Sequence, residues 1–372
     1  MKKVIAVVLI LLVGVLFGGC ESNERLTNMT IVQAIGIDSS ENGTAVSLQY
    51  LNLSRSVSTT DTLEGNITDV AYGSADSITD AVTQASKTLS REMFFGQNKI
   101  IVLGRDYAEN HMDQGLDYIL RSKDSRPDVI MSMSYDDAKS IVENESRGAR
   151  VPAENIYKLL NSGEKNGLGA VVTVNDLLNM YQDVTSDIYL PVLKNEEDYV
   201  SCTGVAVFSD NKPAIMLDQE QTFGFLFVND KIDGGSLAVH SETFGNIGLE
   251  ITHSKTDKNV RLENGKIIFE AEIDVDLRIE EMEKGLDVEI NDEAIKNIEQ
   301  LINRKIQAIS VSAFRECVEK NSDPFMVGRY VAKADEDYYR RVKDHWKENV
   351  KHVEIQVKVT SSVQRINSIS GR

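Results

Sequence analysis

An alternating pattern of side chains dominates the C-terminal third of this chain. From Ile267 to Ile279 every second residue is apolar, and most of the residues between them are acidic. Because strand side chains point alternately to two faces, the pattern predicts one long strand with a buried face and an acidic, solvated face. The apolar set is Ile267, Phe269, Ala271, Ile273, Val275, Leu277 and Ile279. Such a strand needs a second layer over its apolar face.

A long helix after this strand can supply that layer. Asn291 is the expected N-cap, and Asp292 and Glu293 follow in the first turn, where the helix dipole favours acidic groups. Pro324 prevents continuation of the helix. Its predicted apolar stripe is Ile295, Ile298, Ile302, Ile306, Ile309, Ala313 and Cys317. We expect this stripe to lie on the sheet.

The end of the chain completes the same layer structure. Tyr338, Val342 and Trp346 have helical spacing, which predicts a second helix over residues 335–349. A closing strand follows, and its inward residues are Val353, Ile355, Val357 and Val359. We therefore predict an α+β protein of several mixed α/β domains, whose C-terminal domain is an amphipathic β-sheet packed against two helices.

The first half of the chain alternates strands and helices. Two β-rich segments, 30–37 and 45–53, flank Asn42-Gly43 and predict a hairpin. Ser77 is the expected cap of the next helix, whose stripe is Ile78, Val82, Ala85 and Leu89. Further strands are expected at 99–103 and 128–134, and helices at 113–120 and 136–143.

The middle of the chain reads as mostly helical up to residue 200. Pro152 opens one helix, Asn175 is expected to cap another, and strands at 203–208 and 213–217 turn across Asp210-Asn211. We divide the chain into a signal peptide (1–19), an N-terminal α/β domain (20–143), a middle domain of a helical segment plus a β-hairpin (144–232) and a C-terminal α+β domain (233–372).

The N-terminus has the pattern of an export signal. Lys2 and Lys3 precede an apolar run from Val4 to Phe17, which is 14 residues long. That length suits the core of a signal peptide and is too short for a membrane-spanning helix. The segment ending in Gly18-Gly19-Cys20 resembles the lipobox of bacterial lipoproteins. We expect cleavage after Gly19, with diacylglyceryl and N-linked acyl groups (palmitate among the acyl chains) on Cys20; the alternative is a free thiol at an ordinary cleavage site.

Charge excludes two classes of partner. The chain has 40 Lys and Arg against 58 Asp and Glu, a net charge of −18, and loss of Lys2 and Lys3 with the signal peptide would make it −20. A chain this acidic is not expected to bind nucleic acid, or to be held on anionic lipid by basic patches. Lipid on Cys20 would explain how an acidic body stays at a membrane.

Catalytic and metal-binding motifs are missing from the sequence. The five histidines lack the HExxH spacing, and no GxGxxG after a strand, Walker A or GxSxG motif occurs. The runs 335–337, 195–198 and 38–42 could hold a cation, but a helix start, a solvated loop and a plain turn explain them better. Cys202 and Cys317 read as buried free thiols, although export permits a disulfide. We predict no catalytic, metal or cofactor-binding residue.

Four stretches resemble the Ger(x)C family, the lipoprotein C subunits of spore germinant receptors. They are Arg25-Leu with Ile31 to Asp38 (IVQAIGID), Phe94 to Gly104 (FFGQNKIIVLG) preceded by Leu89-Ser and Arg91, Gly204 to Asp210 (GVAVFSD) with Gly234-Gly235, and Asp323-Pro-Phe with Tyr338 and Trp346. Departures are Glu21-Ser22 after Cys20, where the family commonly has Trp-Asp, and Gln97, where it often has His. In the second stretch we expect Phe94 and Phe95 to pack in the core, Gly96 to turn and Lys99 to begin a strand; the alternative is contact with a partner.

The resemblance implies a sporulation protein needed for nutrient-triggered germination. It implies a lipid-anchored, non-enzymatic subunit on the extracytoplasmic face of the spore inner membrane, in complex with the integral-membrane A and B subunits, without a cofactor. The alternative is a solute-binding lipoprotein that captures a small nutrient, and a cell-wall hydrolase ranks last.

Overall fold

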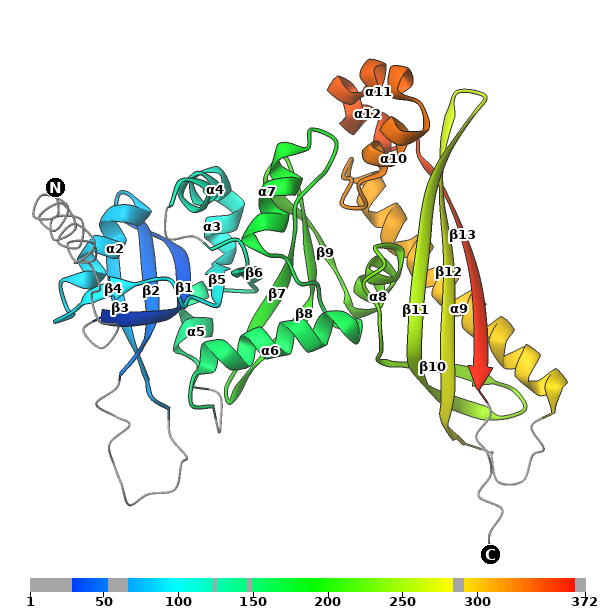
Figure 1. The fold of residues 1–372 in the computed structure, drawn as a ribbon, viewed down its shortest axis with the longest axis horizontal. Helices are drawn as coiled ribbons and strands as arrows, with labels where there is room; N and C mark the ends of the chain where they lie inside the picture. Colours follow the sequence, from blue (N-terminus) through cyan, green and yellow to red (C-terminus); the bar gives the residue numbers. More distant parts are fainter. Residues whose placement is uncertain (1–28, 53–65, 123–125, 146–148, 284–290, 365–372) are drawn as a thin grey trace, which may run out of the picture.

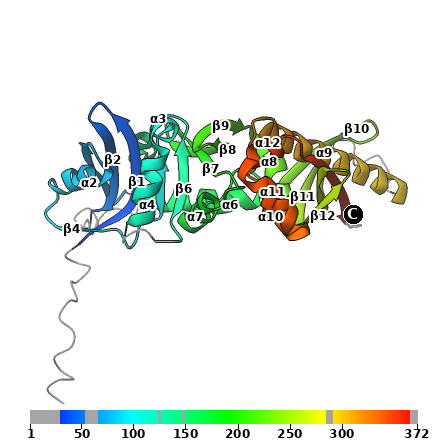
Figure 2. The ribbon, with the colours of Figure 1, turned by 90° about the horizontal axis from the view of Figure 1, so that it is seen from above.

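The computed structural model describes residues 29–52, 66–122, 126–145, 149–283 and 291–364. The molecule is elongated, with one β-sheet in each half (Figure 1), and the view from above shows the same succession of parts (Figure 2). The first sheet has nine strands and the second has four. The mixed α/β architecture confirms the predicted fold class.

The nine-stranded sheet has the order β3-β2-β1-β5-β6-β7-β8-β9, and β4 pairs with β1. Its strands are β1 (Met29–Ser40), β2 (Gly43–Leu51), β3 (Thr68–Ala75), β4 (Glu92–Phe94), β5 (Ile100–Leu103), β6 (Ile130–Ser134), β7 (Tyr189–Glu196), β8 (Tyr199–Ser209) and β9 (Lys212–Leu217). The central strands β1, β5, β6 and β7 are parallel, and antiparallel strands flank them. Where the chain divides into separately folding domains stays a prediction.

Helices cover both faces of this sheet. Ile101 and Leu103 of β5 belong to one apolar cluster, and Ile100 and Val102 to a second, as strand alternation requires. The first cluster includes buried residues of α2, α3, α4 and α7, and the second those of α5 and α6. The bounds are α2 (Ile78–Ser86), α3 (Arg105–Asn110), α4 (Met112–Arg121), α5 (Ala138–Glu143), α6 (Pro152–Lys165) and α7 (Val174–Gln182).

In this half of the chain, the first hairpin and the cap of α2 were predicted correctly, because each depends on residues close together in the sequence. β1 and β2 pair as the predicted antiparallel hairpin, with Ser40 opposite Gly43. The Ser77 hydroxyl caps α2 by accepting the backbone N–H of Asp80 at 3.1 Å. The expected cap at Asn175 is wrong: Thr173 caps α7 through a reciprocal capping box with Asp176.

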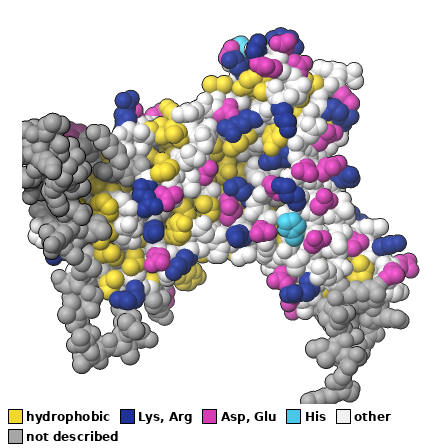
Figure 3. Space-filling model, viewed as in Figure 1, with side chains coloured by type: hydrophobic (Ala, Val, Ile, Leu, Met, Phe, Trp, Pro, Cys, Tyr) yellow, Lys and Arg dark blue, Asp and Glu magenta, His cyan; other side chains and the backbone are white. Residues whose placement is uncertain are grey.

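The second sheet has the order β10-β11-β12-β13. Its strands are β10 (Ser236–Ser241), β11 (Gly245–Glu263), β12 (Lys266–Met282) and β13 (Glu354–Gln364). All seven residues of the predicted apolar set on β12 are buried, which confirms the long amphipathic strand. Figure 3 shows Lys or Arg and Asp or Glu interspersed on the opposite face, where Arg278 contacts Glu250 and Lys358 contacts Glu272.

The helices of this half are α8 (Gln219–Val228), α9 (Asp292–Glu319), α10 (Val327–Ala334), α11 (Glu336–Val342) and α12 (Trp346–Val350). Asn291 caps α9 as predicted, with Ala294 N–H donating to its side chain at 2.9 Å, and the whole predicted stripe is buried. Figure 1 shows α9 running along the sheet and α10 to α12 gathered at one end. The single helix expected over residues 335–349 is wrong, because a 3-10 turn separates α11 from α12.

Five strands were absent from the prediction, β3, β4, β7, β10 and β11, and three of them have a clear physical reason. β11 is the long partner of β12, but a register shift between Ile251 and His253 breaks its alternation. β7 lies in the segment expected to be helical, and its uniformly apolar start gives no period-two signal. β3 is an edge strand that has few apolar residues and contains Gly73, so its sequence gives a weak strand signal.

Candidate functional site

The two sheets meet through a continuous apolar core, not a cleft. α8 lies at the junction, and its Phe225 ring is 4.9 Å from Tyr189 of β7 and 5.2 Å from Phe325, centroid to centroid. Phe314 of α9 lies 5.1 Å from Phe325 and 5.6 Å from Phe269 of β12. These five rings are all buried and form a row from the first sheet to the second, which we call the aromatic row.

Helix α8 forms here because its ends are specified and its body is apolar. Asp218 and Gln221 make a reciprocal capping box at its start. The helix then crosses α9 at very close range: a Cβ on Gly224 would lie 2.2 Å from the Ile309 carbonyl oxygen. Only glycine fits this crossing. Residues 223–228 are almost entirely apolar, and such a run does not by itself distinguish a helix from a strand.

Asp323 is the polar centre of the junction. Its side chain is fully buried, and it accepts backbone N–H groups of Val327 at 3.0 Å and Gly328 at 3.1 Å, at the start of α10. The Trp346 indole N–H of α12 donates to the same carboxyl at 3.0 Å. One side chain thus joins the loop after α9 to two later helices, and the neighbouring Phe325 belongs to the aromatic row.

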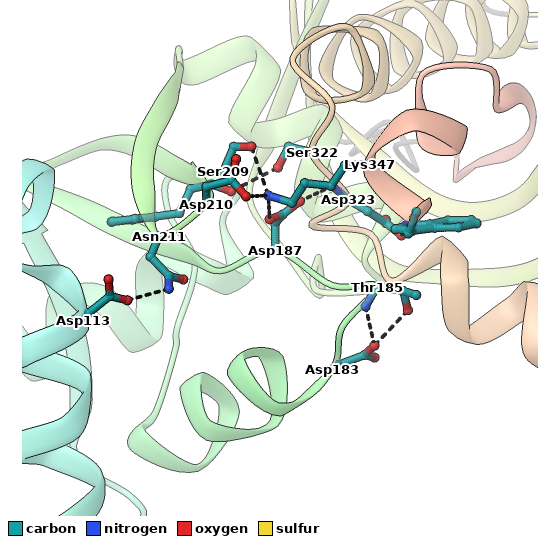
Figure 4. A network of polar contacts seen from close by, with 12 residues as sticks. Asp113, Asp183, Thr185, Asp187, Ser209, Asp210, Asn211, Ser322, Asp323 and Lys347 are labelled. Carbon is teal, nitrogen blue, oxygen red and sulfur yellow. Dashed lines mark hydrogen bonds and ion pairs between the residues drawn. The ribbon is translucent and has the colours of Figure 1, made fainter. Parts of the chain in front are cut away.

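Charged groups surround this centre on the side of the first sheet (Figure 4). The Asp323 backbone N–H donates to Asp187 Oδ2 at 2.8 Å. Lys347 Nζ lies 3.3 Å from Asp187 Oδ1 and 2.6 Å from Asp210 Oδ1. The Ser322 hydroxyl donates to the Phe208 carbonyl at 3.1 Å. Together, the loop after α9 and helix α12 bond to strand β8, the loop before β7 and the turn after β8.

The chemistry of this junction favours coupling of parts over catalysis. Both Asp323 oxygens receive N–H donors, so the carboxyl is engaged in holding the fold. Burial raises the pKa of the Asp323 carboxyl to about 7, although its three donors favour the charged form. Protonation of the Asp323 carboxyl is therefore expected to change the stability of the fold with pH.

We expect Asp323 to make stability depend on pH. The folded carboxyl has a pKa raised from 3.8 to about 7, so between these values the folded state holds a proton that the unfolded state releases. The contribution of Asp323 to stability therefore falls as pH rises from about 4 to about 7, and is level above that. Relative to Asp323→Asn, the wild type should lose about 3 kcal/mol between pH 5 and 8 in urea unfolding. Parallel pH curves for the two proteins would contradict this.

A groove of about 810 Å³ lies on the first sheet, away from the junction. It runs between α2 and α4, and Phe95 forms part of its wall. Apolar side chains line its floor and acidic ones its rim. The lining includes Ile78, Val82, Phe95 and Tyr118, with Asp76, Asp113, Asp117 and Arg121.

The FFGQNK stretch lies beside this groove. Phe94 pairs with Ile31 at the end of β4, and the Asn98 N–H closes a turn onto the Phe95 carbonyl at 2.9 Å. Phe94 and Phe95 are half-buried; Phe95 packs against the main apolar cluster, as expected, whereas Phe94 does not belong to that cluster. Their position at the end of a short strand leaves one side of Phe95 open to the groove.

Of the three cysteines, the structure describes Cys202 and Cys317 but not Cys20. Cys20 and the signal peptide lie outside the described residues, so lipidation stays a prediction. Cys202 and Cys317 are free thiols; Cys317 is buried and Cys202 half-buried. Burial raises the pKa of the Cys202 thiol to about 11, which makes it unreactive. In the described ranges, no helix is long and apolar enough to span a bilayer.

The three candidate cation runs have other uses. Asp38 accepts the N–H groups of Ala138 at 2.7 Å and Lys139 at 2.9 Å, at the start of α5. Asp335 caps α11 by accepting the Tyr338 N–H at 2.8 Å. The run 195–198 begins inside β7, so the expected loop is only its second half. Among the residues that the structure describes, no group of three His, Cys, Asp or Glu could hold a metal.

Sequence reasoning missed the roles of Asp187, Lys347 and Gly224. Their partners lie far away in the chain, as with Lys347 and Asp187, so no local spacing indicates them. Asp323 was singled out only as part of a motif. The one signal in the sequence was the position of this Asp directly before Pro324 and Phe325.

Two family models match the chain in order. The model described as "Spore germination protein N-terminal domain" matches residues 22–195, and "Spore germination B3/GerAC like, C-terminal" matches residues 203–367. Spore germination protein GerQC of Bacillus cereus is 21% identical over 362 residues, covering 95% of this chain and 98% of its own. Spore germination protein KC of Bacillus subtilis (strain 168) is 21% identical over 410 residues, covering 98% and 96%. The crystal structure of the GerBC protein has a TM-score of 0.59 at 18% identity, covering 88% of this chain and 96% of its own, and shows the same fold.

Proposed function

Because the chain belongs to the Ger(x)C family of spore germination proteins, we propose that it is the lipid-anchored C subunit of a nutrient germinant receptor. In this role it works at the extracytoplasmic face of the spore inner membrane, in complex with the integral-membrane A and B subunits. It has no catalytic activity and needs no cofactor. The relatives that it matches over nearly their whole length are spore germination proteins, which supports this assignment.

The observation that carries the proposed coupling role is the filled junction. In a two-lobed solute-binding protein the ligand lies in a cleft between the lobes. Here the aromatic row and α8 fill that place, and Gly224 brings α8 onto the α9 backbone. The two sheets are therefore expected to move as one body, which suits a subunit that assembles or couples a receptor. The solute-binding alternative loses support for the same reason.

The anchor is tested with Cys20→Ala. Without the acylated cysteine, the acidic body loses its direct attachment to the bilayer and keeps only its contacts with the membrane subunits, so we expect most of the variant to leave the membrane fraction of spores and germination by nutrients to be impaired. Fractionation of disrupted spores and the loss of optical density on germinant addition measure the two effects. Cys202→Ala is the matched control and should stay at the membrane. Full germination by a Cys20→Ala protein that is absent from membranes would refute the anchoring role.

A further inference from the structure

The groove between α2 and α4 has the features of a protein docking site. Its floor is apolar, with Val82 and Tyr118 half-buried and Ile78 buried beneath them. Its rim carries Asp76, Asp113 and Asp117 against the single cation Arg121. An apolar floor with a polar rim is the usual composition of a protein–protein contact.

The carboxylates on this rim differ in the partners that they contact. Asp117 pairs with Arg121 at 2.6 Å, and Asp113 accepts the Asn211 amide at 2.7 Å (Figure 4). Asp76 makes no ion pair with any other described residue. The groove thus keeps net negative charge, which favours a basic occupant and repels the phosphates of an anionic bilayer.

A short length of chain separates Cys20 from the strand that precedes the groove. The first residues of β1 pair with β4, Met29 opposite Glu92 and Ile31 opposite Phe94, and Phe95 of the groove follows directly. An extended chain from Cys20 to Met29 spans at most about 30 Å. If Cys20 is acylated, Met29 and the neighbouring start of β4 are held within that reach of the bilayer surface, where integral-membrane subunits emerge, and the groove begins just after β4.

We propose that this groove receives a basic segment with an apolar face from an integral-membrane subunit of the receptor. The proposal rests on the proposed function and adds the contact surface to it. Apolar side chains of the partner lie against Val82, Phe95 and Tyr118, and its Lys or Arg residues meet the rim at Asp76. The half-buried Phe95 packs against the core with one side and would contact the partner with the other.

Photocrosslinking in intact spores tests the contact. The full lipidated chain carries Val82→p-benzoylphenylalanine in the groove, and the control carries Tyr199→p-benzoylphenylalanine, an exposed position beside α6 on the other face of the sheet. We expect the groove position to crosslink a Lys- or Arg-containing peptide of an integral-membrane receptor subunit, and the control position not to. Crosslinks to lipid, to residues 21–28 of the chain itself, or none above the control would overturn the proposal.

A change of charge on the rim tests the same contact without altering the apolar floor of the groove. Asp76→Lys should lower co-purification with the membrane subunits about fivefold, because a Lys on the rim repels the basic residues of the partner. Asp274→Lys makes the same charge change on the exposed face of β12 and should not. Changing the crosslinked Lys or Arg to Glu should restore binding of Asp76→Lys. Equal effects of the two lysine variants would overturn the proposal that the groove binds a membrane subunit. If the wild-type chain itself never co-purifies with membrane subunits, the proposed function fails instead.

Discussion

Phe325→Ala is expected to lower the free energy of unfolding by about 4 kcal/mol, as is usual for removal of a fully buried ring. Phe325 is 0% exposed and lies between the rings of Phe225 and Phe314. Because these neighbours belong to α8 and α9, the cavity would lie at the junction of the two sheets and could close only if the helices moved. Urea unfolding monitored by circular dichroism measures the change.

The matched control for this prediction is Tyr199→Ala. Tyr199 is also aromatic but is 58% exposed, so its loss should change stability by only about 0.5 kcal/mol. We further expect Phe325→Ala spores to respond weakly to nutrients while the protein stays at the membrane. A Phe325→Ala protein as stable as the Tyr199→Ala protein would show that the aromatic row does not hold the two sheets together.

Gly224→Ala is the second large change, by about 3 kcal/mol, because overpacking forces a backbone shift. The added Cβ would lie 2.2 Å from the Ile309 carbonyl oxygen and 2.7 Å from the Ser310 nitrogen. Both are backbone atoms of α9, so no rotation of a side chain relieves the clash. The two helices must separate, which also disturbs Phe225 in the aromatic row.

Gly163→Ala provides a closely matched control. Gly163 is likewise a buried helical glycine, in α6, but a Cβ there meets only the Leu168 Cβ, at 3.8 Å. Alanine is the better helix former, so this variant should gain about 0.5–1 kcal/mol. Opposite signs for the two glycines in urea unfolding are expected. Equal effects would mean that helix propensity, not the α8–α9 crossing, decides the outcome.

These predictions bear on how firmly the two sheets are joined. A body with a filled junction can pass a displacement from one sheet to the other, whereas a hinged body would absorb it. Asp323 adds a polar clasp to the apolar row, since three N–H donors from α10 and α12 converge on it. Coupling between the sheets is therefore the property that we expect variants at the junction to lose.

Elements with local signals were predicted well. The alternation of β12 and the stripe of α9 each repeat many times, so a few exceptions do not obscure them, and Asn291 and Ser77 cap their helices through neighbouring residues. β11 was not recognised, because its register shift and its buried Ser254 and Thr256 remove the apolar alternation. Its pairing with β12 supplies what its own sequence does not show.

The sequence by itself determined the layers of the C-terminal sheet, the acidic surface and the family, because periodicity, charge and motifs are properties of residues close together in the chain. Only the tertiary structure decided that Phe225, Phe314 and Phe325 form one row, that Gly224 must be glycine and that Asp323 binds Trp346. It also placed Phe95 at the boundary between the core and a groove. These facts depend on which distant segments meet, and the side-chain pattern of one segment carries no record of the surface that it will contact.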